Sequence, residues 1–191
     1  MLPSFAADGF LPLGRYSVSF EEAESMLVDA VEFQDSPTRR TLWEGLDRYI
    51  QRFFALEDAY LDDARLIQGV WLGGSFVSSK YEPRNIDAAL LIDVEAERAV
   101  RGNPGSKWLT SAFKSRDSIR EKFGVSPLRI GYHRVAHVFE PERFTPEERT
   151  YFTERGVWDD WWQRCRLPDQ EARSPSEQSA IPARGYLEVR L

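Results

Sequence analysis

Two short apolar runs near the middle of the chain constrain its fold more than any other feature. Residues 66–72 read Leu-Ile-Gln-Gly-Val-Trp-Leu and end at Gly73-Gly74, and residues 86–92 form a second run of the same length that ends at Asp93. Each run is short for a helix and is bounded by turn residues, which is typical of a buried strand. Helical patterns flank them. The sequence therefore predicts an α/β (α+β) protein with a small mixed sheet flanked by helices.

Capping and breaking residues place the flanking elements. Ser19 with Glu22 forms a capping box that opens a first helix, and Ser36-Pro37 starts a second helix over roughly residues 38–57. A mixed helical stretch ends at Gly124. We further predict a long third strand over 128–139, a helix over about 146–166 and a last, edge strand over 185–191.

The length of 191 residues and the 42% hydrophobic content suit one domain that buries its own core. No internal repeat or second domain is evident. We predict a single domain over 1–191, with an N-terminal helical extension (about 1–60) and a C-terminal aromatic helix and tail (about 145–191).

The charge balance limits the partners that the surface suits. Lys plus Arg is 25 and Asp plus Glu is 31, so the formal net charge is −6. Broad nucleic-acid binding is not expected, since it needs a basic face. No apolar run is long enough to cross a membrane, and the first residues do not resemble a signal peptide. With Cys165 as the sole cysteine, we expect a cytoplasmic protein without disulfides and no membrane partner.

The turn between the two apolar runs contains the residues best suited to bind a phosphate or a metal ion. Gly73-Gly74 lets backbone N–H groups approach a phosphate closely, and the Ser75 hydroxyl adds a donor. Asn85 and Asp87 stand two apart at the start of the second run, so both side chains lie on one face of the strand. Paired oxygen ligands on one face can hold divalent cations for phosphoryl transfer.

This arrangement resembles the signature of the DNA polymerase β-like nucleotidyltransferase superfamily. The resemblance implies that a nucleotidyl group passes from an NTP to a hydroxyl of a protein, an RNA or a small molecule. It implies nucleotide binding by Gly73, Gly74, Ser75 and Lys80, and Mg²⁺ or Mn²⁺ held by Asp87 and Asn85.

A narrower resemblance covers most of the chain. The segments that carry it are 11–16 (Leu-Pro-Leu-Gly-Arg-Tyr), Arg39-Arg40 with 42–46, 74–77 with Lys80 and Pro83, and 184–189 (Arg-Gly-Tyr-Leu-Glu-Val). They are similar to the uncharacterised bacterial and phage proteins of the DUF6932 type. The superfamily resemblance adds toxin–antitoxin and phage-defence roles as analogies.

The catalytic pattern is incomplete here. Asn85 stands where the resemblance expects the first acid, and the predicted third strand holds no Asp or Glu before Glu140. His137 on that strand could replace a missing acid or act as a general base. Asp93 lies on the same face of the strand as Asp87 but too far along the strand to bind the same metal ion. Two hypotheses stay open: a metal-dependent transferase, and a catalytically inactive interaction module with a protein partner.

Each candidate site residue could instead have a purely structural role. Asp87 could cap a turn, Asn85 could be a turn residue and Lys80 could be solvated. His133 and His137 could be ordinary strand residues. We expect a solvated helix face carrying Arg39, Arg40, Arg48 and Arg52, with a basic patch as the alternative, and packing of Trp158, Trp161 and Trp162 against the body.

Overall fold

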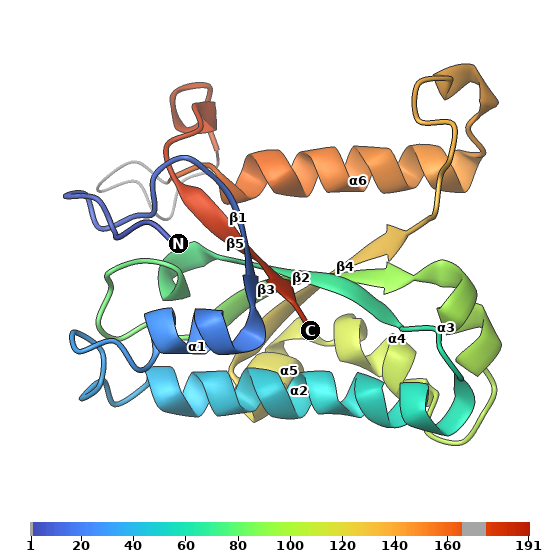
Figure 1. The fold of residues 1–191 in the computed structure, drawn as a ribbon, viewed down its shortest axis with the longest axis horizontal. Coiled ribbons are helices and arrows are strands. Elements are labelled where there is room, and N and C mark those ends of the chain that lie inside the picture. Colours follow the sequence, from blue (N-terminus) through green and yellow to red (C-terminus); the bar gives the residue numbers. More distant parts are fainter. Residues whose placement is uncertain (1, 166–174) are drawn as a thin grey trace.

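The computed structural model describes residues 2–165 and 175–191 and places a mixed five-stranded sheet between two helical layers (Figure 1). The strands are β1 (Gly14–Ser19), β2 (Ile67–Gly73), β3 (Ile86–Asp93), β4 (Val125–Tyr132) and β5 (Gly185–Arg190). The helices are α1 (Phe20–Leu27), α2 (Arg39–Tyr60), α3 (Val94–Val100), α4 (Lys107–Lys114), α5 (Arg116–Phe123) and α6 (Pro146–Trp162). This confirms the predicted fold class.

The strand order is β1-β5-β2-β3-β4. β1 runs parallel to β5 and β3 parallel to β4, whereas β2 is antiparallel to both of its neighbours. The prediction that the C-terminal segment is an edge strand is wrong. β1, which lies in the segment predicted as a helical extension, takes the edge. β5 is therefore paired on both sides, and its tyrosine and aliphatic side chains are buried.

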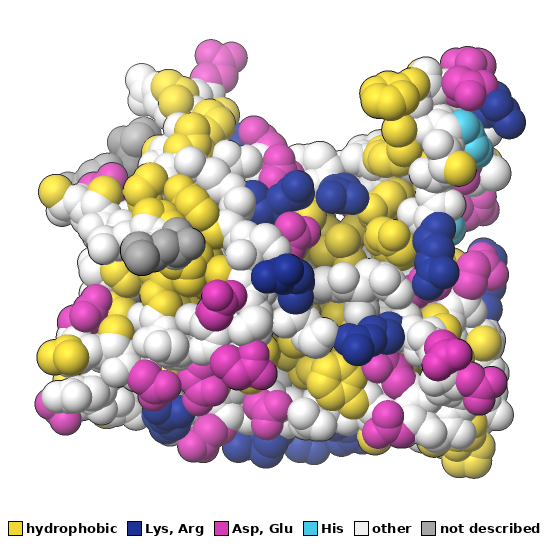
Figure 2. Space-filling model, viewed as in Figure 1, with side chains coloured by type: hydrophobic (Ala, Val, Ile, Leu, Met, Phe, Trp, Pro, Cys, Tyr) yellow, Lys and Arg dark blue, Asp and Glu magenta, His cyan; other side chains and the backbone are white. Residues whose placement is uncertain are grey.

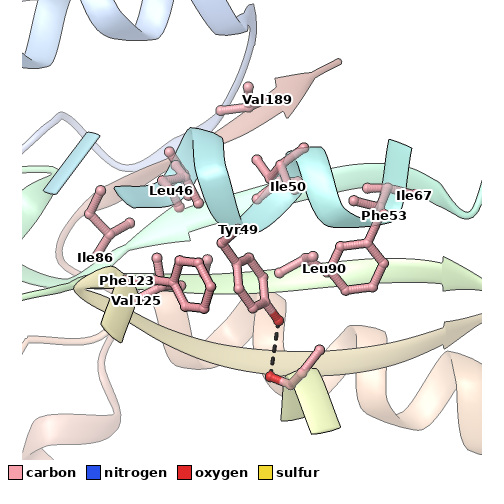
Figure 3. Close-up of a cluster of buried hydrophobic side chains, with 14 of the residues drawn as sticks. Leu46, Tyr49, Ile50, Phe53, Ile67, Ile86, Leu90, Phe123, Val125 and Val189 are labelled. Carbon is pink, nitrogen blue, oxygen red and sulfur yellow. Dashed lines mark hydrogen bonds between the residues drawn. The ribbon is translucent and has the colours of Figure 1, made fainter. Parts of the chain in front are cut away.

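The larger core lies on the side of the sheet that α1 to α5 cover. Leu46, Ile50 and Phe53 on one face of α2 pack toward Ile86 and Leu90 of β3, as Figure 3 shows. Tyr49 lies between them, fully buried, and its hydroxyl donates to the Ala112 carbonyl at 3.1 Å. The 22-residue α2 is therefore the main support of the sheet.

Within the described residues, α6 is the helix that covers the opposite face of the sheet (Figure 1). Its Tyr151 and Trp162 join Trp71, Ala89 and Tyr186 in a second, smaller core. Trp158 and Trp161 pack against this core while half-buried, in agreement with the expected packing role of these tryptophans. Capping boxes open both α1 and α6, and the one at Ser19 confirms the prediction.

Two predicted boundaries need correction. The third strand covers Val125–Tyr132 rather than 128–139 because its partner β3 ends at Asp93, which caps α3 and leaves later residues nothing to pair with. The stretch before it is not one helix but α4 and α5, which break at Ser115. Gly124 ends α5 with φ +68°, as predicted.

The expected solvated arginine face is wrong for Arg39. This side chain is fully buried, and its guanidinium donates to the carbonyl oxygens of Leu27, Phe76, Ser78 and Lys80 at 2.6–3.0 Å. It also lies 3.6 Å from the Phe33 ring centroid. Arg40 next to it is exposed and pairs with Glu24 and Asp29. Arg39 thereby ties α1, α2 and the segment after β2 together.

No helix in the described part of the chain combines the length and apolar character that crossing a membrane requires. Acidic and basic side chains are interspersed over the face that Figure 2 draws. Among the residues coloured there, this face offers no continuous basic surface to a phosphate backbone.

Candidate functional site

The Gly-Gly-Ser turn and Asp87 lie side by side at one end of the sheet. Gly73 is the last residue of β2 and pairs with Asp87 near the start of β3. Gly74 follows with φ +70° and opens a single 3₁₀ turn that contains Ser75. The predicted neighbourhood of the glycines, Asn85 and Asp87 is therefore present.

The space in front of both glycines is filled by protein side chains. A Cβ on Gly73 would lie 2.4 Å from Cε3 of Trp162, and a Cβ on Gly74 would lie 2.3 Å from Oδ2 of Asp87. Real Cβ atoms do not come so close to other atoms. Close packing of Trp162 and Asp87 thus explains both glycines without a phosphate.

Asp87 is a half-buried acid with cationic and amide partners. Its Oδ1 accepts from Nδ2 of Asn85 at 3.0 Å and from the Arg116 guanidinium at 3.3 Å. Burial raises the pKa of Asp87 above its ordinary value, while Arg116, the Asn85 hydrogen bond and the nearby Arg184 oppose that shift. Burial also lowers the pKa of the Arg184 guanidinium, which donates to the Trp162 carbonyl oxygen at 3.2 Å.

The neighbouring strand supplies no third acid. Asp87 pairs with Ser126 of β4, a residue with 2% of its surface exposed. The next residue on that face is Leu128. Across residues 2–165 and 175–191, no three His, Cys, Asp or Glu side chains gather where they could hold a metal ion.

These residues do not fit a magnesium site. Mg²⁺ prefers several oxygen ligands with negative charge, and two-metal phosphoryl transfer needs a shared set of carboxylates. Here one carboxylate faces a guanidinium, and Asn85 directs its amide nitrogen, a donor, at that carboxylate. The residues around Asp87 therefore form an ion pair with Arg116 within the protein and not a set of metal ligands.

Comparison of the sequence with family models matches residues 3–190 to a family of unknown function (DUF6932). This chain belongs to the DUF6932 family. The searches of curated proteins and of solved structures returned no match. The DUF6932 match includes every candidate site residue but assigns none of them a role.

The structure does not bring His137 to Asp87 in this DUF6932 chain. β4 runs away from the Asp87 end and stops at Tyr132, and His137 lies in the following segment, beside the start of α6. Its Nε2 is 3.8 Å from Oε2 of Glu148, and its ring lies 5.7 Å from that of Phe144. His133 is also outside the strand, next to Tyr151.

Lys80 and Asp93 have other surroundings. Lys80 is exposed, and its side chain lines a cavity against α2 rather than contacting Asp87. Asp93 caps α3 by accepting from the backbone N–H groups of Glu95 and Ala96 at 3.0 and 3.1 Å. This agrees with its predicted exclusion from the Asp87 site.

The sequence did not reveal that Arg116, Ser126 and Arg184 lie near Asp87, or that Trp162 lies against Gly73. They come from α5, β4, the end of α6 and the residue before β5. Only the fold brings these distant segments together. Of these residues, only Arg184 was marked in the sequence, because it belongs to segment 184–189, which carries the family resemblance.

Proposed function

We propose that this DUF6932 chain is a nucleotidyltransferase-like domain that has lost metal-dependent transfer and acts as an interaction module. The nucleotidyltransferase part of the proposal rests on the sequence resemblance. It is supported by the adjacency of Gly73-Gly74 and Asp87 on antiparallel strands.

The surroundings of Asp87 are the observation from which we infer that metal-dependent transfer has been lost. Among the described residues, Asp87 is the only carboxylate at the predicted metal position. It is hydrogen-bonded by Asn85 and Arg116 and stands opposite Ser126. A metal ion there would have to displace the Arg116 guanidinium and would be bound by a single negatively charged ligand, Asp87. Affinity for Mg²⁺ or Mn²⁺, and hence for a metal–NTP complex, should be low.

The surface near this end suits a protein partner. Arg116 is exposed over 54% of its side chain and Trp158 and Trp161 of α6 are half-buried. Arginine and tryptophan are the side chains that most often anchor protein interfaces. A partner of the toxin–antitoxin or phage-defence kind is the class that the resemblance implies.

The competing function is an active transferase that moves a nucleotidyl group from an NTP to a hydroxyl. Calorimetric titration of the protein with each NTP and Mg²⁺ or Mn²⁺ separates the two. We expect no metal-dependent NTP binding at millimolar concentration. Metal-dependent binding that is lost in Asp87→Ala, and kept in Asp117→Ala on the adjacent α5, would overturn the proposal. Asp117 is a suitable control because its side chain is 89% exposed.

A further inference from the structure

The cavity that Lys80 lines lies between the start of α2 and the segment that leads into β3. Its volume is about 500 Å³, within the range of small-molecule sites. Thr38, Thr41 and Leu42 form one wall, and Lys80, Pro83 and Arg84 form the other. It is separate from the Asp87 site, since Asp87 faces the α6 side of the sheet and Leu42 belongs to the opposite core.

Buried contacts fix the two walls relative to each other. The Ser36 hydroxyl donates to the Tyr81 carbonyl oxygen at 2.7 Å. Arg39 donates to the carbonyl oxygens of Ser78 and Lys80 at 2.7 and 2.6 Å. The backbone that carries Lys80 is therefore anchored to α2 before any ligand arrives, and preformed sites lose less entropy on binding.

The cavity presents cations that the protein does not neutralise. Within the described residues, no carboxylate oxygen lies within 4 Å of the Lys80 ammonium or the Arg84 guanidinium. Glu82 lines the same cavity, so the three charged side chains sum to +1. Two cationic side chains on one wall of the cavity attract an anionic group.

Hydroxyl and apolar groups complete the cavity. Thr41 adds an exposed hydroxyl. Leu42 and Pro83 are buried and give the cavity an apolar floor.

We propose that this cavity binds a small phosphomonoester without a metal ion. Lys80 and Arg84 hold the phosphate, Thr41 donates a hydrogen bond, and Leu42 and Pro83 contact the apolar part of the ligand. Glu82 accepts from a hydroxyl or amine of the ligand and disfavours a second phosphate. No bond is made or broken, and the site does not depend on the proposed loss of transfer at Asp87.

The experiment is calorimetric titration in EDTA with AMP, ribose 5-phosphate and inorganic phosphate as probes, and with adenosine as the phosphate-free control. We expect at least one phosphate-bearing probe to bind at submillimolar concentration, and adenosine to bind about tenfold more weakly or not at all. A Lys80→Met, Arg84→Met double variant should lose about tenfold or more in affinity for that probe, because two charge-assisted contacts are removed.

A matched variant, Lys107→Met with Arg149→Met, removes the same charges from exposed positions outside the cavity and should bind as the wild type does. Circular dichroism checks that both variants fold. The proposal is overturned if none of the three phosphate probes binds at millimolar concentration, if adenosine binds equally well, or if the two double variants bind alike. Binding that requires Mg²⁺ and is lost in Asp87→Ala would place the ligand at Asp87 instead.

Discussion

Arg39 carries its charge inside the protein with backbone carbonyl oxygens as partners. Burial lowers the pKa of its guanidinium to about 10, and the charge of Glu32 opposes that shift. The group is thus still protonated at neutral pH. Its contacts hold α1, α2 and the residues after β2 in one arrangement.

Arg39→Met should destabilise the fold by about 4 kcal/mol, since the lost guanidinium leaves four carbonyl oxygens without their donor. Arg40→Met removes only exposed ion pairs and should cost less than about 1 kcal/mol. Urea denaturation of both variants measures the difference. Equal losses would mean that the buried contacts of Arg39 add little.

Asp87 gives a pH-dependent prediction. Burial raises its pKa in the folded state above the ordinary value of 3.8. The folded protein therefore binds the proton more tightly than the unfolded chain does. The stability that this group contributes is fully present below pH 3.8 and is lost as the pH rises through the folded-state pKa.

Asp87→Asn has no such titration, so its stability relative to the wild type should increase as the pH rises from about 3.5 to 7. Taking the difference between the two proteins cancels the other titrating groups. Urea denaturation over this pH range measures it. A difference that falls with pH would show that the ion pair with Arg116 outweighs burial.

At the scale of elements, α6 is fixed to the sheet partly through the contact of Trp162 with Gly73. Gly73→Ala should cost about 1–3 kcal/mol because the new methyl group overlaps the indole. The cost should be clearly smaller in a Trp162→Ala background. Gly69→Ala in the same strand is the control, since its Cβ would meet no atom within 4 Å.

A double-mutant cycle from chemical denaturation gives the coupling between Gly73 and Trp162. Additive losses would mean that the new methyl group is opposed by something other than the Trp162 indole. The cycle therefore tests whether the contact with Trp162 is what requires a glycine at position 73.

Short-range patterns predicted the elements well. The capping box at Ser19, the Ser36-Pro37 break and the Gly124 stop all mark observed boundaries. The third strand was misplaced because its end depends on where β3 turns into α3. A local pattern in 128–139 contains no information about the length of a partner strand.

At the scale of the whole molecule, the sequence predicted the fold class and the meeting of Gly73-Gly74 with Asp87. Strand order was not predictable locally, because β1 and β5 pair across nearly the full chain. For the same reason, the partners of Asp87 from α5, β4 and the residue before β5 were missed. Arg39 was misjudged because an arginine in a run of polar helix residues usually faces water.

The central claim is that the Asp87 site lacks the charge to bind a catalytic metal. Titration with Mn²⁺ and ATP, on the wild type and on an Asn85→Asp, Ser126→Asp variant that adds two acids beside Asp87, tests it most directly. We predict no metal-dependent ATP binding by the wild type at millimolar concentration and a gain of Mn²⁺ affinity in the variant with three acids. Tight Mn²⁺–ATP binding by the wild type, lost in Asp87→Ala, would contradict it.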